Sequence, residues 1–244
     1  MIMINEYMGK VEQLIRKVTN YEEEEMRQAA QKIAEALESD GVIHLFGSGH
    51  SHLLAEELYY RAGGLVPINP ILHEPLMLHE GAIKSSEIER KEGYAQSFMT
   101  KQDIRKGDVL IVVSTSGRNA VPVEVALFGK EKGAYVITVT ATEYSKSQDS
   151  RHSSGERLFE VADLVLNTHI PTGDALMSHE NIDVSFAPGS TVVGAAMLNA
   201  VVAEAINLMA ENGNEPPIFL SANVKGGDER NKALIEKYGS RVKM

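Results

Sequence analysis

The chain has 244 residues, with 24 Lys and Arg against 34 Asp and Glu, which gives a formal net charge of −10. This acidic balance argues against a nucleic-acid-binding protein, because contacts to a phosphate backbone need an excess of basic side chains. Cysteine is absent, which excludes disulfides, thiolate nucleophiles and cysteine-based zinc or iron–sulfur sites. With 43% hydrophobic and 24% charged residues, the composition is typical of a globular protein with a full core.

Two segments bear on localisation. The N-terminal residues 1–10 include the acidic Glu6 and lack the apolar core of a signal peptide. The apolar run Gly189–Ala203 has 15 residues, fewer than the roughly 20 that a membrane-spanning helix needs. We therefore expect a soluble, cytoplasmic protein that does not contact a membrane.

The first forty residues predict a helical hairpin. Apolar residues recur at helical spacing in two stretches: Val11, Leu14, Ile15 and Val18, then Met26, Ala30, Ile33, Ala34 and Leu37. The acidic run Glu22–Glu25 lies between them. It is typical of a first helical turn, which the helix dipole favours, although the same run is compatible with a cation site.

After Gly41, short apolar runs alternate with helical patterns. Five runs predict strands, over residues 42–46, 65–71, 109–113, 135–140 and 164–166. Continuous β-branched runs separated by helices indicate a parallel sheet with helices on both faces. We therefore expect an α/β fold, a doubly wound five-stranded parallel sheet in a flavodoxin-like three-layer arrangement with an N-terminal helical hairpin.

The remaining segments complete a single predicted domain over 1–244. The nearly apolar segment 189–210 predicts a long core helix, and the Ser-rich segment 142–155 predicts a loop. Residues 218–220 predict a short strand, and a last helix is expected from about Asp228. Residues 1–40 are then a helical extension, 41–210 the α/β core and 211–244 a C-terminal tail.

Two loops follow predicted strands and carry matching chemistry. The first is Gly47-Ser48-Gly49-His50-Ser51, and the second is Ser114-Thr115-Ser116-Gly117-Arg118-Asn119. Ligands of open parallel sheets bind outside the carboxyl ends of the strands, where the strand order reverses. Glycines allow close approach to a ligand, hydroxyls donate hydrogen bonds, and the N–H groups that begin a helix favour a phosphate.

Each loop also has an ordinary interpretation. The first is compatible with a tight turn, and the second with a Ser-rich helix cap. A dinucleotide-binding fingerprint is not supported, because His52 stands where the third glycine is needed, and no P-loop motif occurs. Two such loops at successive strand ends are less well explained by these ordinary interpretations than either loop alone.

Taken together, the loops resemble those of the SIS (sugar isomerase) domain family. Its members carry a G-x-G-x-S loop after the first strand and an S-x-S-G-x-[S/T] loop after a later one. The resemblance covers about residues 42–210 and implies the SIS fold and a phosphorylated sugar as ligand. The tail segments 219–223 and 226–231 are similar to a bacterial branch near the phosphoheptose isomerases and muramic-acid-phosphate etherases.

The resemblance also implies which residues bind the substrate. Ser51, Ser114, Ser116 and Asn119 would hold the phosphate, with assistance from Thr115. Asn119 departs from the hydroxyl that the family has at this position, but its amide can still donate. Ser48 and His50 would face the sugar, and the backbone of Gly47, Gly49 and Gly117 would shape the site.

An aldose–ketose isomerase must move a proton between adjacent carbons, and histidines and carboxylates are the usual general bases. The richest cluster of such residues lies between the second and third predicted strands: His73, Glu74, His79, Glu80, Glu87 and Glu89. The His79-Glu80-Gly81 segment is similar to the His-Gly-Asp segment of arabinose-phosphate isomerases. Glu87 resembles the acid/base glutamate of the etherases. We predict catalytic roles for His79 and Glu87, the alternative being solvated loop residues.

Glu57 is a third catalytic candidate. It lies about two helical turns after Ser51 and resembles the position of a zinc-binding histidine in phosphoheptose isomerases. Those enzymes use a glutamate one turn later, where this chain has Arg61. We therefore expect no metal and no other cofactor, with zinc as the alternative, and Glu57 is also compatible with a surface helix position.

The leading hypothesis is a sugar-phosphate isomerase that works through an enediol. A lyase that cleaves an ether of an amino-sugar phosphate, and a non-catalytic sugar-phosphate sensor, are the alternatives. The family resemblance further implies a homo-oligomer, either a dimer or a tetramer.

Overall fold

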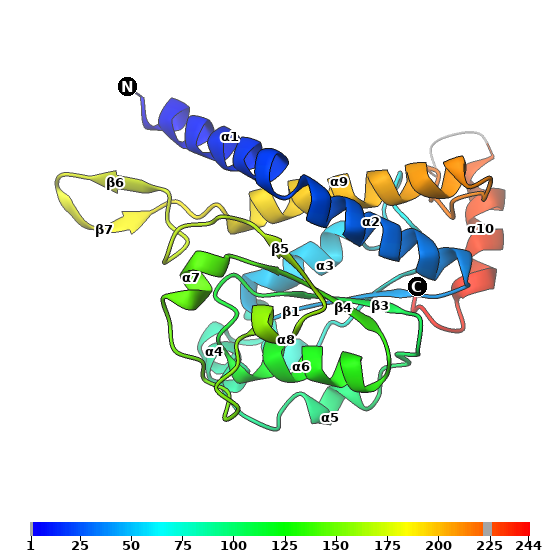
Figure 1. Cartoon of the computed structure of the whole chain (residues 1–244), viewed down its shortest axis with the longest axis horizontal. Coiled ribbons are helices and arrows are strands. Elements are labelled where there is room, and N and C mark those ends of the chain that lie inside the picture. Colours follow the sequence, from blue (N-terminus) through cyan, green and yellow to red (C-terminus); the bar gives the residue numbers. More distant parts are fainter. Residues whose placement is uncertain (1, 222–225) are drawn as a thin grey trace.

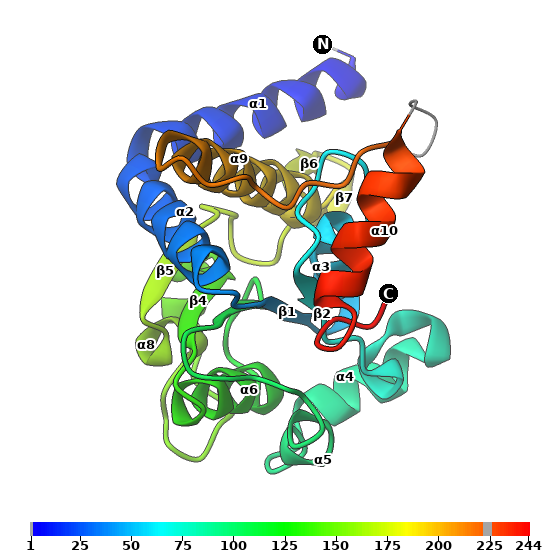
Figure 2. The same cartoon turned by 90° about the vertical axis from the view of Figure 1, so that its right-hand side faces the viewer.

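The computed structural model describes residues 2–221 and 226–244. Its centre is a parallel sheet of five strands in the order β2-β1-β3-β4-β5. The strands are β1 (Ile43–Gly47), β2 (Ile68–Pro70), β3 (Val109–Val113), β4 (Tyr135–Thr140) and β5 (Leu164–Asn167). Figures 1 and 2 show this sheet between two layers of helices. The predicted doubly wound α/β fold is therefore confirmed.

Helices cover both faces of the sheet. On one face lie α2 (Glu23–Glu38), α3 (His52–Leu58) and α9 (Ser190–Glu211), with α1 (Met3–Tyr21) extending outward along α9 (Figure 1). On the other face lie α4 (Ala82–Glu89), α5 (Gln96–Met99), α6 (Ala120–Glu131) and α8 (Leu158–Val161). Short helical turns are η1 (Gly49–Ser51), η2 (Glu74–Leu76), η3 (Leu78–Glu80) and α7 (Thr142–Lys146).

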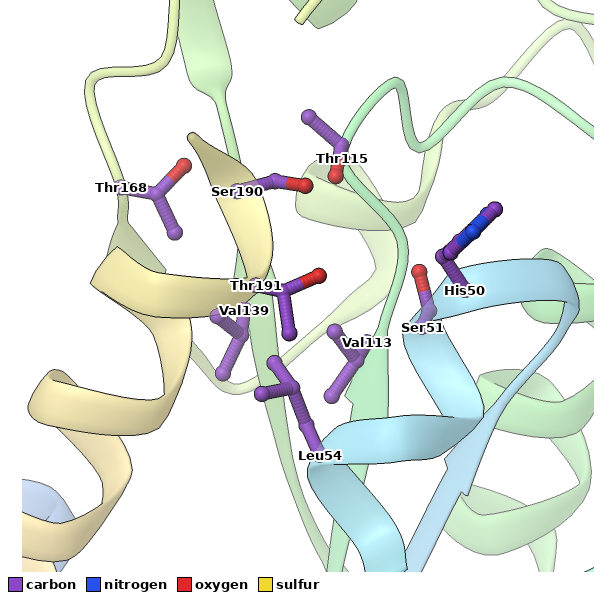
Figure 3. Close-up of a pocket in the computed structure, with 9 residues that line it drawn as sticks. All are labelled: His50, Ser51, Leu54, Val113, Thr115, Val139, Thr168, Ser190 and Thr191. Carbon is purple, nitrogen blue, oxygen red and sulfur yellow. The ribbon is translucent and has the colours of Figure 1, made fainter. Parts of the chain in front are cut away.

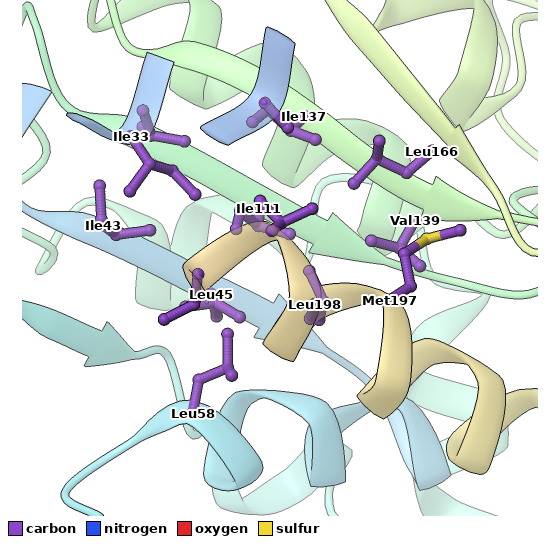
Figure 4. Close-up of a cluster of buried hydrophobic side chains, with 14 of the residues drawn as sticks. Ile33, Ile43, Leu45, Leu58, Ile111, Ile137, Val139, Leu166, Met197 and Leu198 are labelled. Carbon is purple, nitrogen blue, oxygen red and sulfur yellow. The ribbon is translucent and has the colours of Figure 1, made fainter. Parts of the chain in front are cut away.

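Strand side chains alternate between two hydrophobic clusters. Leu45 and Ile111 join Leu198 of α9 on the first face (Figure 4). Phe46 and Leu110, the neighbours of these strand residues, pack on the opposite face with α4, α6 and α8. Because helices bury both faces, the strands are uninterrupted apolar runs, which is why the sequence pattern identifies them.

The edge of the sheet differs from the prediction. The strand expected over 65–71 is reduced to β2, because Leu65 forms an antiparallel bridge with Ile218 of the tail instead. The expected strand 218–220 is likewise only this bridge. The last helix is α10 (Gly227–Tyr238), and its Tyr238 lies in one hydrophobic cluster with Val66. Figure 2 shows α10 beside α3. The tail segment 219–223, which is similar to a bacterial branch of the family, lies partly outside the described residues, because these leave out 222–225.

Two further segments depart from the sequence prediction. The expected loop 142–155 begins with the helical turn α7 before it becomes irregular. The antiparallel hairpin of β6 (Met177–His179) and β7 (Ile182–Phe186) was not expected. It projects beside α1 in Figure 1. Its second strand, Ile-Asp-Val-Ser-Phe, does alternate apolar and polar residues, but over five residues only.

Helix α9 is longer than the apolar run that was considered as a membrane span. It has 22 residues and, among the described helices, is the one that is long and apolar enough to span a membrane by length and composition alone. Its inner face, which includes Met197, Leu198 and Val201, is buried in the core on the sheet. This packing is that of a core helix, so the apolar composition of α9 has a structural explanation.

Candidate functional site

The site lies where the strand order reverses. From β1 the chain crosses to β2 on one side and returns to β3 on the other. At this point the loops after β1 and β3 diverge, which is where open α/β sheets bind ligands. Gly47 and Val113, the last residues of β1 and β3, are register partners. The loops 47–51 and 114–119 therefore begin side by side, as the sequence predicts.

A pocket opens between these two loops and the first turn of α9 (Figure 3). It is lined by His50, Ser51, Leu54, Val113, Thr115, Val139, Thr168, Ser190 and Thr191. Figure 3 shows the hydroxyls of Ser51, Thr115 and Ser190 directed into the space between the loops and α9. Among these lining residues, His50 is the one with a titratable side chain.

The first loop turns sharply because of its glycines. A Cβ atom at Gly47 would overlap the backbone of Ser51 and His52. Gly49 has a φ of 55°, in the left-handed region that glycine adopts without steric cost. The backbone N–H of Ser51 donates to the carbonyl of Ser48 over 3.0 Å. This compact turn places His50 and Ser51 directly at the start of α3.

The close approach at Gly47 predicts a large effect of a single methyl group. We expect Gly47→Ala to lower the free energy of unfolding by about 3 kcal/mol, because backbone rather than a flexible side chain must move. Urea denaturation measures this value. Gly9→Ala is the control, since Gly9 lies in α1 with open space around its Cα, and there alanine should add up to about 1 kcal/mol. A Gly47→Ala protein as stable as the wild type would contradict the packing.

The second loop is held by its own hydrogen bonds. The hydroxyl of Ser114 accepts a bond from the N–H of Gly117 over 3.2 Å. Gly117 has a φ of 58°, and a Cβ there would lie 3.1 Å from the hydroxyl oxygens of Ser145 and Thr140. Asn119 is the N-cap residue of α6, and its Oδ1 accepts a bond from Nη1 of Arg151 over 2.9 Å. This bond leaves the Asn119 amide nitrogen to act as a donor.

The structure brings part of the predicted binding set into the pocket. His50, Ser51 and Thr115 line it, whereas Ser48 and Ser114 are buried beneath the loops, with exposures of 6% and 5%. Ser116 and Asn119 are partly exposed on the second loop beyond Thr115. Three of the predicted residues therefore line the pocket, and the others lie on or beneath the same two loops.

The predicted catalytic side chains lie at different distances from this surface. His79 in η3 and Glu87 in α4 belong to a segment that reaches the first loop, where Leu78 lies close to Gly49. Both side chains are exposed, that of His79 by 62%. Glu57 in α3 forms an ion pair with Arg61 and accepts a bond from Nδ2 of Asn199 over 3.0 Å. Within the described chain, none of the three lines the pocket.

The sequence analysis did not identify the third wall of the pocket. Thr168 follows β5, and Ser190 and Thr191 begin α9. A signal was present, because Gly189-Ser190-Thr191 repeats the pattern of glycine and hydroxyl residues directly before a helix. By itself this pattern indicates only the start of a core helix.

In residues 2–221 and 226–244, no group of three or more His, Cys, Asp or Glu side chains could hold a metal ion. Arg61, which replaces a carboxylate in the family comparison, pairs with Glu57. These side chains provide no cation-binding set next to the pocket.

Comparisons with known proteins agree with this fold. A family model described as "SIS domain" matches residues 6–141. The UPF0309 protein BH0227 of Halalkalibacterium halodurans is 59% identical over 240 residues, covering 98% of this chain and 96% of that protein. A phosphoheptose isomerase from Francisella tularensis superposes with a TM-score of 0.55 at 17% identity, covering 83% of this chain and 96% of that one. A phosphoheptose isomerase from Neisseria gonorrhoeae gives a TM-score of 0.52 at 17% identity, covering 85% and 97%. The family model and the close relative together show that the chain belongs to the SIS domain family.

Proposed function

We propose that the chain binds a phosphorylated sugar in the pocket at the switch point, with the phosphate at the loops 47–51 and 114–119. The observation that carries this proposal is the convergence of hydroxyls from Ser51 and Thr115 at paired strand ends. The start of α6 adds outward N–H groups and the amide of Asn119. Such donors suit a phosphate, and a few of them are enough to bind one even in a protein with a net negative charge.

We further propose that the chain is an aldose–ketose isomerase. A base removes the proton from C2 of the aldose and returns a proton to C1, while the hydroxyl proton at O2 is lost and O1 is protonated. This sequence passes through an enediol and needs one group that titrates near neutral pH. His50 lines the pocket and is the first candidate for the base, and His79, Glu87 and Glu57 remain the other candidates.

The similar structures support this choice without deciding it. Both of those described above are phosphoheptose isomerases, but at 17% identity they share only the fold with this chain. Function depends on the residues of a site rather than on its fold. The chemistry of this chain therefore needs a direct assay.

Incubation with sugar phosphates in D₂O separates the possible activities. An isomerase yields the ketose with deuterium at the former aldehyde carbon, which NMR detects, and we expect this result. A lyase would instead release lactate from a muramic-acid phosphate. Tight binding with no turnover over a broad panel would overturn the isomerase proposal in favour of a sensor, and the absence of any binding would overturn the ligand itself.

We also propose that the chain forms a cytoplasmic dimer or tetramer. Helix α1 exposes large apolar side chains, including Ile4 and Met8, with Ile2 directly before it, and the β6–β7 hairpin exposes Val184. Contiguous exposed apolar surface is typical of an interface. Sedimentation velocity should give the mass of two or four chains, and a single chain at micromolar concentration would contradict this proposal.

A further inference from the structure

The hydroxyls of the pocket differ in where their protons point. The hydroxyl of Ser190 lies 2.6 Å from Oδ2 of Asp174 and donates its proton to that carboxylate. Thr168 uses its hydroxyl proton on the carbonyl of Thr140, over 3.3 Å. Both side chains line the pocket, so the groups that they offer a ligand are oxygen lone pairs. Through Ser190 and Thr168 this wall accepts hydrogen bonds instead of donating them, and Thr191 adds a third hydroxyl to it.

The carboxylate of Asp174 also binds backbone groups at the start of α9. Its Oδ1 accepts the backbone N–H groups of Gly189 and Ser190 over 3.0 and 2.9 Å. These are two of the donors that a phosphate would otherwise take at a helix N-terminus. Asp174 has a φ of 50°, a left-handed conformation that is uncommon outside glycine. The three hydrogen bonds to α9 offset the cost of this conformation.

We propose that the α9 end of the pocket is an acceptor subsite, which takes a hydroxyl or ammonium group of the sugar and rejects a second anionic group. Asp174 is its positioning residue, because it fixes the proton of Ser190 and places a negative charge behind it. This inference rests on the proposed phosphate position at the loops 47–51 and 114–119. The substrate class is then a monophosphate of a neutral or amino sugar, and not a bisphosphate or a phosphorylated sugar acid.

The Asp174→Asn variant tests this assignment because it reverses the direction of the hydrogen bond between residue 174 and the Ser190 hydroxyl. Asparagine keeps an oxygen for the N–H groups of Gly189 and Ser190 and tolerates a left-handed backbone. Its Nδ2 would donate to the Ser190 hydroxyl, whose own proton would then point into the pocket. The subsite changes from acceptor to donor, and the negative charge is removed.

Titration calorimetry with hexose and pentose monophosphates, each paired with its bisphosphate and its aldonic-acid phosphate, measures the discrimination. We expect the wild type to favour the monophosphate at least tenfold, and Asp174→Asn to reduce this ratio by about tenfold or more. Ser190→Ala should weaken monophosphate binding but keep the rejection of anions, since Asp174 remains.

Asp163→Asn is the matched control. Its carboxylate likewise accepts a backbone N–H, from Val136 over 2.9 Å, but its partners Val136 and Lys130 do not line the pocket, whereas Asp174 bonds the lining residue Ser190, so the ratio should not change. Equal binding of the monophosphate and the aldonic-acid phosphate by the wild type would overturn the acceptor subsite alone. An unchanged ratio of these affinities in Asp174→Asn would do the same. A wild type that binds no sugar phosphate would overturn the proposed function and this inference with it.

Discussion

Replacing Ser51 with alanine and Thr115 with valine together should weaken binding of a sugar phosphate by a factor of about 10² to 10⁴. A hydrogen bond to a charged group contributes about 1.5 to 3 kcal/mol, and two independent bonds add to about 3 to 6 kcal/mol. Both side chains line the pocket from opposite loops. The main-chain bonds of Thr115, which accepts from Ala141 and Thr140, are kept in valine.

Titration calorimetry with the tightest monophosphate of a panel measures this loss. The fold should be unaffected, because neither substitution removes a buried side chain, and the midpoint of thermal unfolding reports this. Thr100→Val is the control, since its hydroxyl is exposed, bonds Gln96 and does not line the pocket. A double variant that binds within threefold of the wild type would show that the phosphate lies elsewhere.

The Asp108→Asn substitution should lower the free energy of unfolding by about 3 to 5 kcal/mol, the range for breaking a buried ion pair. Asp108 is 1% exposed at the start of β3. Its carboxylate accepts bonds from the N–H of Val42, the N–H of Arg105, Nε2 of His44 and both Nη atoms of Arg241. It therefore joins β1, β3 and the C-terminal tail. The asparagine would remove the carboxylate that pairs with the mostly buried charge of Arg241 over 2.6 Å and leave it with Asp103 at 3.4 Å.

The same carboxylate predicts a pH dependence. Burial alone would raise the pKa of Asp108, but the bonds from His44, Arg241 and the two backbone N–H groups outweigh it and hold this pKa well below its usual range. A depressed carboxylate pKa stabilises the folded state above the unfolded pKa of about 3.9, and this contribution is lost as the pH falls toward the folded-state value.

Urea denaturation of wild type and Asp108→Asn between pH 7 and pH 3 measures both effects. The difference between the two proteins should be constant near neutral pH and should shrink below about pH 4. Asp183→Asn, at an exposed position in the hairpin, should match the wild type throughout. A difference below about 1 kcal/mol at pH 7, or one that grows in acid, would contradict the role assigned to Asp108.

The parts of the fold that the sequence predicts are those with local, repeated patterns. The strands at 43–47 and 109–113 are buried on both faces, so their residues are continuously apolar apart from His44. The two loops can be predicted because glycine and serine residues come directly after these strands. Gly47 and Gly117 are required sterically by contacts with Ser51 and with Ser145, so the motif has a physical basis.

The parts that escape prediction depend on residues far apart in the chain. Thr168 and Ser190 reach the pocket only because the end of β5 and the start of α9 lie at the same edge of the sheet. The pairing of Asp108 with Arg241 spans 133 positions. Leu65 pairs with Ile218 instead of extending β2, which no local pattern indicates. Glu22 was read as part of an acidic helix turn, yet it is buried and bonds His169 over 2.7 Å.

The central claim is that the pocket recognises the phosphate of a sugar. The most direct measurement is the shift in unfolding midpoint caused by a panel of sugar phosphates, each compared with its unphosphorylated sugar. A ligand at about 100 times its Kd adds about 2.7 kcal/mol, which for a chain of this length is about 5 to 10 °C. We predict such a shift for at least one sugar phosphate and none for its free sugar. No shift with any sugar phosphate, or an equal shift with the free sugar, would contradict the phosphate site.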